Sequence, residues 1–456
     1  MGSTTIDQLR EGVRGSVVTA DDSSYDEARG VMNAMIDKRP RAIVRCVNAG
    51  DVMAAVGFAR DNGIDLAVRG GKHSVPGFGT AEGGVVADLS PMRGVRVDPV
   101  RRTARVDGGA TWGDVNTATY PFGLAVTGGI ISTTGVGGLT LGGGIGHLAR
   151  GLGLSCDNLI SADVVTADGK LEIAGENENP DLFWALRGGG GNFGAVTSFE
   201  FKLSPVKDVY GGPMFFELEH AADVLRFYRD FIKDAPEQLG AFPAFHLAPP
   251  LPFIPADRHG TPFLLVVACW AGSIEEGEQA LKPFHDVAPV FAEHVGPMPY
   301  HALNSAFDAL HGPGLQHYWK ANFVKELTDD AIAAHLEYGP KAPAINTAVH
   351  IYPINGAVHR VASGDTAFAY RDASFATVIA GMWPDPADNE SATKWVRDYY
   401  AATAPHSEDG GYINFMADDD QDRIRSNYKD NYDRLVQVKQ KYDPGNLFHL
   451  NQNIKP

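Results

Sequence analysis

The chain has 456 residues, of which 44% are hydrophobic and 21% are charged. At roughly 100–200 residues per domain, this length predicts two or three domains with enough interior to enclose a large cofactor. The formal net charge of -17 opposes binding to nucleic acids or anionic membranes, and no uninterrupted apolar run reaches the length of about 18 residues that a membrane span needs.

The N-terminal segment MGSTTIDQLREG carries acidic residues and has no apolar core. We therefore expect no secretory leader and a cytoplasmic location. The three cysteines, Cys46, Cys156 and Cys269, are odd in number and lack the spacing of a metal site or a redox pair. They are predicted to be buried small side chains, and no metal site is expected.

Residues from about 25 to 200 alternate short β-rich runs with helical stretches, which is typical of an α/β region. The runs RAIVRCV and IDLAVRG predict strands on either side of the helix DVMAAVGFARDNG. Further strands are expected in GGVVADLS, RGVRVDP, RTARVDGG and FGAVTSFEFKL, and a helix is expected from Trp112 toward Pro121. The segment ISADVVTADGKLEI predicts a hairpin that turns at Asp168 and Gly169.

Beyond about Ser204 the pattern changes to longer amphipathic helices and apolar strands. The helices are AADVLRFYRDFIKDA and EEGEQALKPFHDV, and the strands are PFLLVVACWAG and FATVIAGMW. This alternation predicts a second, α+β domain. Near the C-terminus, YKDNYDRLVQVKQKYD predicts one helix that ends before Pro444 and Gly445.

Two glycine-dense stretches occur, RGGKHSVPGFG at residues 69–79 and TGVGGLTLGGGIG at residues 134–146. Closely spaced glycines allow backbone amides to surround a pyrophosphate. Neither stretch has the G-x-G-x-x-G context of a nicotinamide site or the ending of a P-loop. The glycines could instead form only tight turns, but two such stretches, one containing a histidine, favour a dinucleotide.

These stretches belong to a longer pattern. The segments VRGGKHSVPGFG, VVADLS, GVGGLTLGGGIGHLARGLGLSCDNLISADVVTADG and DLFWALRGGGGNFGAVTSFEF occur in this order. They resemble the FAD-linked oxidases of the berberine-bridge type, and YIN with NYDRLVQVKQKYDPGNLFHLNQNI resembles that family's closing segment. The resemblance covers residues from about 40 to 203 and the C-terminal forty-odd residues, whereas the region from about 204 to 410 matches only in general texture.

The resemblance implies an α+β fold with three parts. Residues 1–204 are expected to form the main part of a two-subdomain α/β FAD-binding domain of the PCMH type, as in vanillyl-alcohol-oxidase-like proteins. Residues 205–410 are expected to form an α+β substrate-binding domain with an antiparallel sheet. Residues 411–456 are expected to return to the FAD-binding domain.

The resemblance also implies that FAD is attached through its 8α-methyl group to His73. A neutral imidazole is a competent nucleophile toward that electron-poor carbon, although a lone loop histidine is more often a surface hydrogen-bonding group. Many relatives add a second flavin link through a cysteine at the position of Ile131. Cys156 does not match that position, so a single attachment is expected.

The remaining cofactor contacts are carried over from the family's motifs. The expected cofactor-binding residues are Arg69, Gly70, Gly71, Lys72, His73, Ser74, Gly77, Gly128, Thr133, Thr134, Gly137, Gly138, Gly142, Gly143, Gly146, His147, Val196, Asn451 and Gln452. Lys72 replaces a residue that is usually small in relatives, and it is either solvated or favours the reduced, anionic flavin. Thr134 occupies the family's oxygen-access position. Its valine-like shape favours an oxidase, although its hydroxyl could hold a water in the oxygen path.

Tyr412 and Asn414 form the family's closing Tyr-x-Asn motif, in which the tyrosine often serves as the catalytic base. A phenol with a pKa of about 10 is a poor base unless a donor or a positive charge lowers that pKa. The alternative is a tyrosine packed at a domain seam. His350 and Tyr352 alternate on a predicted strand and therefore share one face, which is either the flavin side or an ordinary sheet surface.

The expected activity is that of an FAD-dependent oxidase in secondary metabolism, which takes a hydride from an alcohol, an amine or an activated C–H of a small organic substrate and reduces O2 to H2O2. The alternatives are a dehydrogenase of the same fold that uses another acceptor, and a catalytically silent flavin-binding protein. A monomer or a homodimer is expected. The family acts on sugars, alkaloids, phenolics and polyketides, so the resemblance does not identify the substrate.

Overall fold

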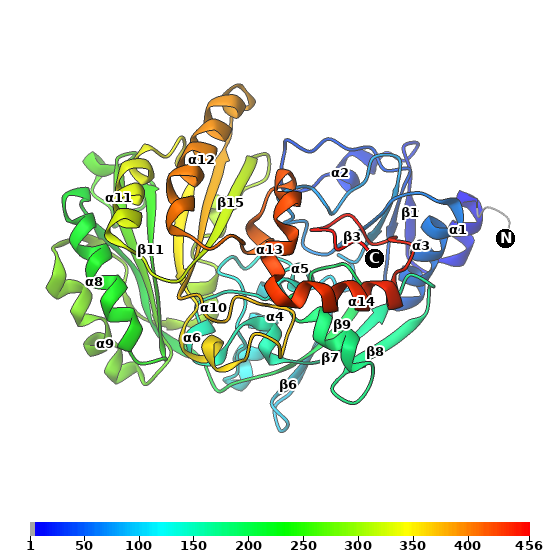
Figure 1. Cartoon of the computed structure of the whole chain (residues 1–456), viewed down its shortest axis with the longest axis horizontal. Helices are drawn as coiled ribbons and strands as arrows, with labels where there is room; N and C mark the ends of the chain where they lie inside the picture. The colour runs from blue at the N-terminus through cyan, green and yellow to red at the C-terminus, as the bar shows by residue number, and fades with distance from the viewer. Residues whose placement is uncertain (1–4) are drawn as a thin grey trace.

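The computed structural model describes residues 5–456, which form three β-sheets with helices packed around them (Figure 1). The first four residues, on which part of the expected absence of a secretory leader rests, lie outside the described residues. No helix in residues 5–456 is long and apolar enough to cross a membrane.

The first sheet has four strands in the order β1-β2-β4-β3. Its strands are β1 (Ser16–Val18), β2 (Ala42–Arg45), β3 (Leu66–Arg69) and β4 (Val85–Asp88), and its helices are α1 (Ile6–Gly12), α2 (Tyr25–Arg29) and α3 (Ala49–Asn62). β2 and β3 both run parallel to β4, and α3 supplies the crossover between them. Helix α3 is capped by the Asn48 side chain and ends at Gly63, whose φ is 60°.

The second sheet is antiparallel, with five strands in the order β5-β6-β9-β7-β8. Its strands are β5 (Val95–Asp98), β6 (Thr103–Asp107), β7 (Leu159–Val165), β8 (Leu171–Gly175) and β9 (Ala195–Lys202), and its helices are α4 (Trp112–Thr119), α5 (Val136–Leu141), α6 (Ala149–Leu152) and α7 (Pro180–Leu186). The hairpin expected at Asp168 and Gly169 is confirmed, since β7 pairs with β8 and Gly169 has a φ of 81°.

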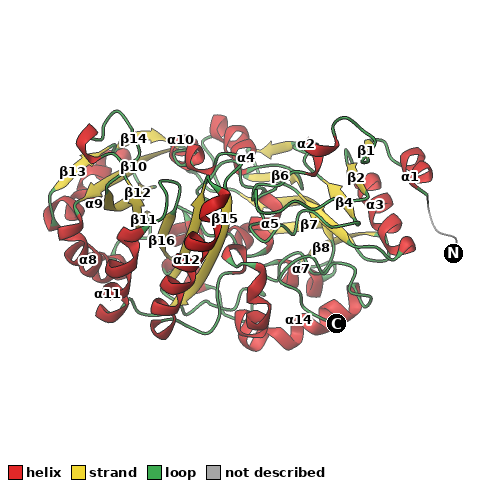
Figure 2. Cartoon of the chain, turned by 90° about the horizontal axis from the view of Figure 1, so that it is seen from above, coloured by secondary structure: helices red, strands yellow, loops and turns green. Residues whose placement is uncertain are grey.

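The third sheet is a large antiparallel one in the order β13-β10-β12-β11-β16-β17-β15, with β14 paired to β10. Its strands are β10 (Asp208–Phe216), β11 (Leu239–Leu247), β12 (Pro262–Trp270), β13 (Val290–Glu293), β14 (Gly296–Pro299), β15 (Gln316–Val324), β16 (Ala348–Pro353) and β17 (Phe375–Trp383), and the accompanying helices are α8 (Ala221–Asp234), α9 (Ile274–Val287), α10 (Tyr300–Asn304), α11 (Asp329–Tyr338) and α12 (Asn389–Thr403). Helices α8, α9, α11 and α12 cover its outer face (Figure 2). The expected α+β fold is confirmed.

Side chains of the third sheet alternate between two cores, as the two-residue period of a strand requires. On β16, Val349 and Ile351 pack in the core beneath the helices, whereas Tyr352 packs in the core on the opposite face. The helix-free face of this sheet therefore looks toward the first two sheets. The domain boundaries expected at 204 and 410 stay a prediction.

The C-terminal segment differs from the sequence expectation. The single helix predicted from Tyr428 to Asp443 is wrong, because α13 (Ile424–Tyr428) and α14 (Tyr432–Tyr442) are separated by Lys429, whose φ is 45°. A non-glycine residue rarely adopts this left-handed region, and it interrupts the helical hydrogen bonds. The predicted end before Pro444 is confirmed.

A buried ion pair ties this segment to the glycine-rich part of the chain. The Lys439 ammonium lies 2.7 Å from a carboxylate oxygen of Asp443, and both side chains are fully buried. The same ammonium donates to the carbonyl oxygens of Asn192 and Phe448 at 2.8 and 2.9 Å. Lys439 thus connects α14 with the loop before β9.

Replacing Lys439 with methionine should strongly destabilise the protein, because the Asp443 carboxylate would stay buried without its cation. Breaking one partner of a buried pair costs about 3–5 kcal/mol. Lys441→Met is the matched control. It breaks a pair of equal length, 2.7 Å, to Asp181 at the surface of the same helix, and exposed pairs contribute at most about 1 kcal/mol. Equal losses of unfolding free energy in urea would contradict the structural importance of Lys439.

Candidate active site

A cavity of about 320 Å³ lies between the first two sheets and the helix-free face of the third sheet. Its walls come from residues 66–79, 129–145 and 190–199, from β15, β16 and β17, and from residues 412–415 and 448–452. Segments that are distant in sequence therefore line one cavity. A cavity of this size with few polar groups is typical of a small-molecule or cofactor site.

The glycine loops approach each other too closely for side chains. A Cβ atom on Gly71 would lie 2.3 Å from the backbone nitrogen of Gly135, and a Cβ atom on Gly135 would lie 2.5 Å from that of Gly71. At two other cavity-lining glycines, Gly138 and Gly191, a Cβ atom would meet no heavy atom within 4 Å. A side chain there would fill the cavity, so these glycines leave room along its wall for a large flat group.

Several buried polar atoms of cavity-lining residues have no partner in the described part of the chain. Arg69 pairs with Asp88 at 2.8 Å, but its Nε and Nη1 atoms are buried without a hydrogen bond, as is Oδ1 of Asn451. Buried donors and acceptors of this kind require a polar partner. Together with the glycine loops, they fit a large polar cofactor such as FAD.

His73 enters the cavity from the loop after β3. Its Nε2 lies 3.0 Å from the Thr133 hydroxyl, and its Nδ1 lies 3.5 Å from the Thr134 hydroxyl. Burial, with a smaller effect of His311, lowers the pKa of His73 to about 4. The imidazole is therefore neutral at pH 7 and keeps the free lone pair that a nucleophile needs.

Lys72 precedes His73 and also lines the cavity. Its φ of 64° lies in the left-handed region, which costs a residue with a side chain about 1 kcal/mol or more. Burial, and next the nearby Arg69, lowers the pKa of its ammonium. Whether Lys72 favours the reduced, anionic flavin stays a prediction.

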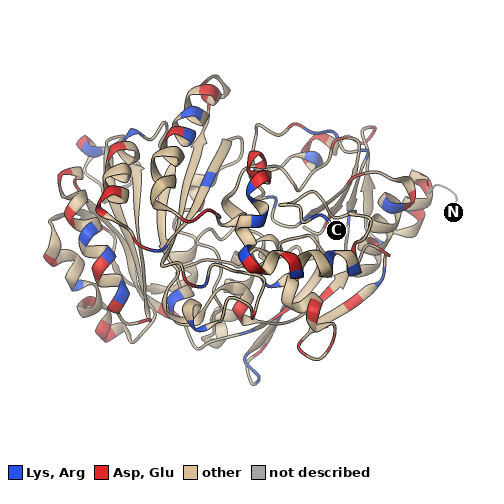
Figure 3. Ribbon diagram, viewed as in Figure 1, with Lys and Arg blue, Asp and Glu red and all other residues tan. Residues whose placement is uncertain are grey.

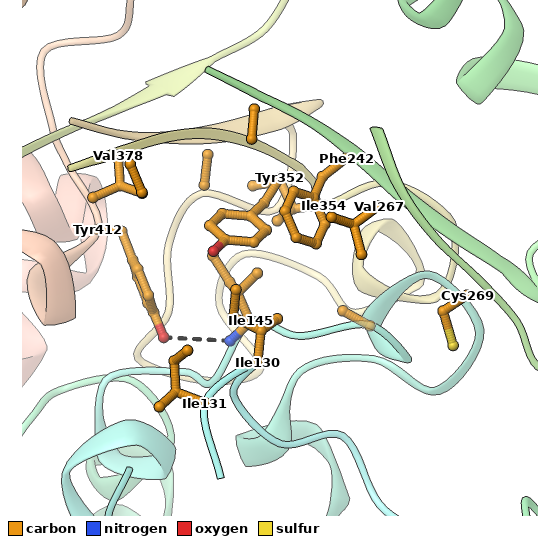
Figure 4. Packing of buried hydrophobic residues seen from close by; sticks show 14 of the residues in the cluster. Ile130, Ile131, Ile145, Phe242, Val267, Cys269, Tyr352, Ile354, Val378 and Tyr412 are labelled. Carbon is orange, nitrogen blue, oxygen red and sulfur yellow. Dashed lines mark hydrogen bonds between the residues drawn. The ribbon is translucent and has the colours of Figure 1, made fainter. Parts of the chain in front are cut away.

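Tyr412 contacts the loop at the end of α5 through its hydroxyl oxygen. This oxygen accepts hydrogen bonds from the backbone nitrogen of Gly144 at 2.8 Å, from that of Ile145 at 3.4 Å (Figure 4), and from Nδ2 of Asn414 at 2.8 Å. Burial nevertheless raises the pKa of Tyr412 to about 12, against the lowering effect of these donors. The hydroxyl is protonated at neutral pH, so its role as a base stays a prediction that requires deprotonation.

The third sheet supplies the wall opposite the glycine loops. The residues that line it are Trp319 on β15, Ala348, His350 and Tyr352 on β16, and Val378 and Ala380 on β17. The predicted alternation of His350 and Tyr352 on a strand is confirmed. Figure 4 shows Tyr352 and Tyr412 entering the space above Ile130, Ile131 and Ile145.

Most of the expected site residues meet at this cavity. Those that line it are Arg69, Gly70, Gly71, Lys72, His73, Ser74, Thr134, Gly137, Gly138, Val196, Tyr412, Asn414, Asn451 and Gln452. Those outside the lining are Gly77, Gly128, Thr133, Gly142, Gly143, Gly146 and His147. Thr133 still contacts His73.

The glycines outside the lining allow other parts of the chain to pack closely. A Cβ atom on Gly128 would lie 2.5 Å from the Trp112 ring, and one on Gly146 would lie 1.7 Å from the carbonyl oxygen of Gly128. His147 is buried near the Phe242 ring. A glycine-rich sequence alone does not distinguish these two uses of a missing side chain.

Other lining residues were missed by the sequence analysis. The run Gly188–Gly194 contributes Gly190, Gly191 and Gly194, and the quoted segment RGGGGNFG was a signal that could have found them. His311 had no such signal. It lines the cavity, and three residues earlier the Asp308 carboxylate accepts a hydrogen bond from the Ser132 backbone nitrogen at 2.8 Å.

Ile131 and Cys156 differ in their relation to the cavity. Ile131 lines it, whereas Cys156 is fully buried outside the lining. Burial raises the pKa of the Cys156 thiol, and a protonated thiol is a poor nucleophile. Within residues 5–456, no group of three or more His, Cys, Asp or Glu side chains is arranged to hold a metal ion.

Two family models match the chain, "FAD binding domain" at residues 40–175 and "Berberine and berberine like" at residues 411–455. An FAD-linked oxidoreductase of Dictyostelium discoideum is 33% identical over 100% of this chain and 98% of its own length. The (R)-6-hydroxynicotine oxidase of Paenarthrobacter nicotinovorans is 30% identical over 97% of both chains. The crystal structure of 6-hydroxy-D-nicotine oxidase from Arthrobacter nicotinovorans superposes with a TM-score of 0.87 and 27% identity, over 99% of this chain and 100% of that one.

Proposed function

Since this chain belongs to the berberine-bridge-like family of FAD-linked oxidoreductases, we propose that it carries FAD covalently on His73 and oxidises a small organic molecule with O2 as the electron acceptor. The family membership makes the protein an FAD-dependent oxidoreductase. When bound, FAD accepts a hydride equivalent from the substrate and passes two electrons to O2. Reduction of O2 with two protons yields H2O2.

The observation that carries this proposal is the neutral His73 imidazole in a cavity whose other walls fit FAD. The hydroxyl groups of Thr133 and Thr134 contact its two nitrogens and restrict the ring. In the proposed linkage, one imidazole nitrogen of His73 would be bonded to the 8α-carbon of FAD. Its formation would release one proton from each partner, and O2 would take up the two electrons.

Other parts of the chain are proposed to bind the cofactor, exclude water and contact the substrate. The segments 69–74, 134–138 and 190–194, which contribute to the cavity lining, would hold the dinucleotide. The strands β15, β16 and β17 close the other side and exclude water with Trp319, Val378 and Ala380. Tyr412 and Asn414 are proposed to contact the substrate where these two walls meet.

An activity screen tests the oxidase assignment directly. Purified protein is supplied with alcohols, cyclic amines such as 6-hydroxynicotine, phenols and oligosaccharides in aerated buffer, and H2O2 is measured with a peroxidase-coupled dye. We expect H2O2 in amounts equal to the oxidised product. Turnover only with an artificial quinone acceptor would instead identify a dehydrogenase, and a yellow protein without turnover on the panel would favour a silent flavin-binding protein.

The oxygen-access role of Thr134 makes a separate prediction. Thr134→Leu should slow the reoxidation of photoreduced enzyme by roughly tenfold, equivalent to about 1.4 kcal/mol of activation free energy. The reason is that the longer side chain would extend into the cavity that Thr134 lines. Stopped-flow mixing with aerated buffer measures this rate.

Thr134→Val is the matched control for that substitution. It removes the hydroxyl that lies 3.5 Å from Nδ1 of His73 but keeps the branched shape. We expect reoxidation as fast as in the unsubstituted protein. If native reoxidation is already sluggish and leucine changes nothing, Thr134 is not the oxygen gate.

A further inference from the structure

A continuous chain of hydrogen bonds leads from the cavity into the third sheet. The Tyr352 hydroxyl lies 2.5 Å from Nδ1 of His350, and Nε2 of His350 lies 3.0 Å from Nε2 of His246. His246, His350 and Tyr352 expose only 4%, 5% and 5% of their surface. These three side chains form a polar row in a wall that is otherwise largely aromatic and aliphatic.

The strand register brings the three side chains together. β11 pairs with β16 in antiparallel fashion, with Ala244 opposite His350. His246 is two residues beyond Ala244, so it shares the same face and lies diagonally across from His350. Tyr352 continues the row along β16 toward the cavity. The row is therefore held by backbone pairing rather than by a mobile loop.

Proton positions in the row follow from the histidine charges. Burial lowers the pKa of His350 well below its usual value and that of His246 to about 4, so both rings are neutral at pH 7. Two neutral imidazoles can share a hydrogen bond only if one nitrogen donates and the other accepts. When Nε2 of His350 donates to His246, Nδ1 of His350 accepts the Tyr352 proton. The Tyr352 oxygen then offers its lone pairs to the cavity.

Tyr412, in contrast to Tyr352, has no neighbouring group in residues 5–456 to which it could pass its own proton. Its oxygen accepts three hydrogen bonds, and none of the hydrogen bonds found for the described residues gives an acceptor to its own O–H. To take a proton from a substrate, Tyr412 would first have to become a phenolate. Tyr352 can take one while it passes its own proton to His350.

The charged residues around the cavity indicate what net charge a substrate in contact with this row can carry. No aspartate or glutamate is among the lining residues of the described chain, and the two cationic ones, Arg69 and Lys72, lie on the glycine-loop side. Elsewhere, charged residues are concentrated on the outer helices and loops (Figure 3). A cationic substrate would find no counter-ion beside Tyr352, so the site suits a neutral molecule.

We propose that Tyr352, His350 and His246 form a proton relay that accepts the O–H or N–H proton of a neutral substrate, an inference that rests on the proposed function. The substrate proton moves to the Tyr352 oxygen, the Tyr352 proton to Nδ1 of His350, and the Nε2 proton of His350 to His246. The neighbouring carbon loses its hydrogen as a hydride to FAD, and the carbon–heteroatom bond becomes double. Loss of the hydride makes the heteroatom proton strongly acidic, so a weakly basic imidazole is sufficient.

Binding of phenol and anisole to the FAD-loaded protein tests the relay without turnover. The two ligands have similar shape, but only phenol can donate to Tyr352. We expect phenol to bind about three- to tenfold more tightly, as one net hydrogen bond provides. Titration calorimetry measures both affinities without turnover, so the result does not depend on whether the protein is an oxidase. Equal affinity for both ligands would overturn the proposal.

Two variants and one control test whether Tyr352 is the group that accepts the hydrogen bond from phenol. Tyr352→Phe should abolish the preference for phenol, and His350→Phe should reduce or reverse it, because Tyr352 would then direct its own O–H into the cavity. Tyr399→Phe is the control, since it removes a similar buried contact, 2.7 Å to Nδ1 of His335, on the helix-covered side. A preference for phenol that persists in folded Tyr352→Phe, or that is undiminished in folded His350→Phe, would overturn the relay.

With a substrate found in the activity screen, the pH dependence of the oxidation rate provides a second test of the relay. Beside the row itself, the titratable groups that act on it are His147, His311 and Tyr412. The relay works while its histidines are neutral, so the oxidation rate should be constant around neutral pH and fall as the pH approaches the lowered histidine pKa values. Tyr352→Phe should slow oxidation by roughly 10²–10⁴-fold. A rate that instead rises continuously with pH would overturn the relay.

Discussion

His73→Ala should convert a protein that keeps its flavin after acid precipitation into one that releases all of it. The imidazole nitrogen is the proposed point of attachment, and alanine offers no nucleophile there. The glycine loops and the unpartnered polar atoms of Arg69 and Asn451 remain, so FAD should still bind noncovalently. Absorbance of pellet and supernatant measures the difference, and mass spectrometry of the native protein should place the flavin on a peptide that contains His73.

His311→Ala is the matched control, because His311 also lines the cavity but is not proposed to bond to the flavin. Its flavin should remain attached. Release of flavin from the unsubstituted protein would contradict covalent attachment but not FAD binding. A flavin-bearing peptide that contains Cys156 would contradict the single linkage. The burial of the Cys156 thiol disfavours such a second bond.

Tyr412→Phe is the second substitution with a large expected effect. It should slow substrate oxidation by roughly 10²–10³-fold, the usual loss when one preorganised hydrogen-bonding group is removed from an active site. The flavin should stay attached, because only a hydroxyl is lost. Stopped-flow reduction with a substrate from the activity screen measures the rate.

The pH dependence of the oxidation rate then distinguishes two roles of Tyr412, a catalytic base and a protonated residue that only contacts the substrate. A tyrosine base must be ionised, and its pKa of about 12 means that the rate would rise with pH without a plateau in the neutral range. A protonated tyrosine that only contacts the substrate would add no ionisation there. Near-equal rates in Tyr412→Phe and the unsubstituted protein would remove this residue from the mechanism.

Tyr228→Phe is the control for loss of a buried hydroxyl. The Tyr228 hydroxyl donates to the Ala241 carbonyl oxygen at 3.0 Å, and the residue packs in the core beneath the helices. Its removal should cost about 1 kcal/mol of unfolding free energy and leave the oxidation rate unchanged. Equal slowing of both variants would show that the effect at Tyr412 is structural.

Local patterns in the sequence were enough to predict most of the elements that build the site. Short β-rich runs located β3 and β4, the helical pattern of DVMAAVGFARDNG located α3, and the two-residue period of a strand placed His350 and Tyr352 on one face. The glycine spacing and His73 identified the loops of the cofactor side. These features depend on neighbours in the chain, which a sequence displays directly.

The tertiary structure alone decided the chemistry of those residues, because pKa values and hydrogen bonds depend on groups that are distant in sequence. Gly144 and Tyr412 are 268 residues apart, and His246 and His350 are 104 apart. No local pattern showed that Tyr412 would be fully enclosed with its pKa raised, or that His350 would connect Tyr352 to a second histidine. Likewise, only packing distinguished the glycines that line the cavity from Gly128 and Gly146, which allow segments of the backbone and the Trp112 ring to meet.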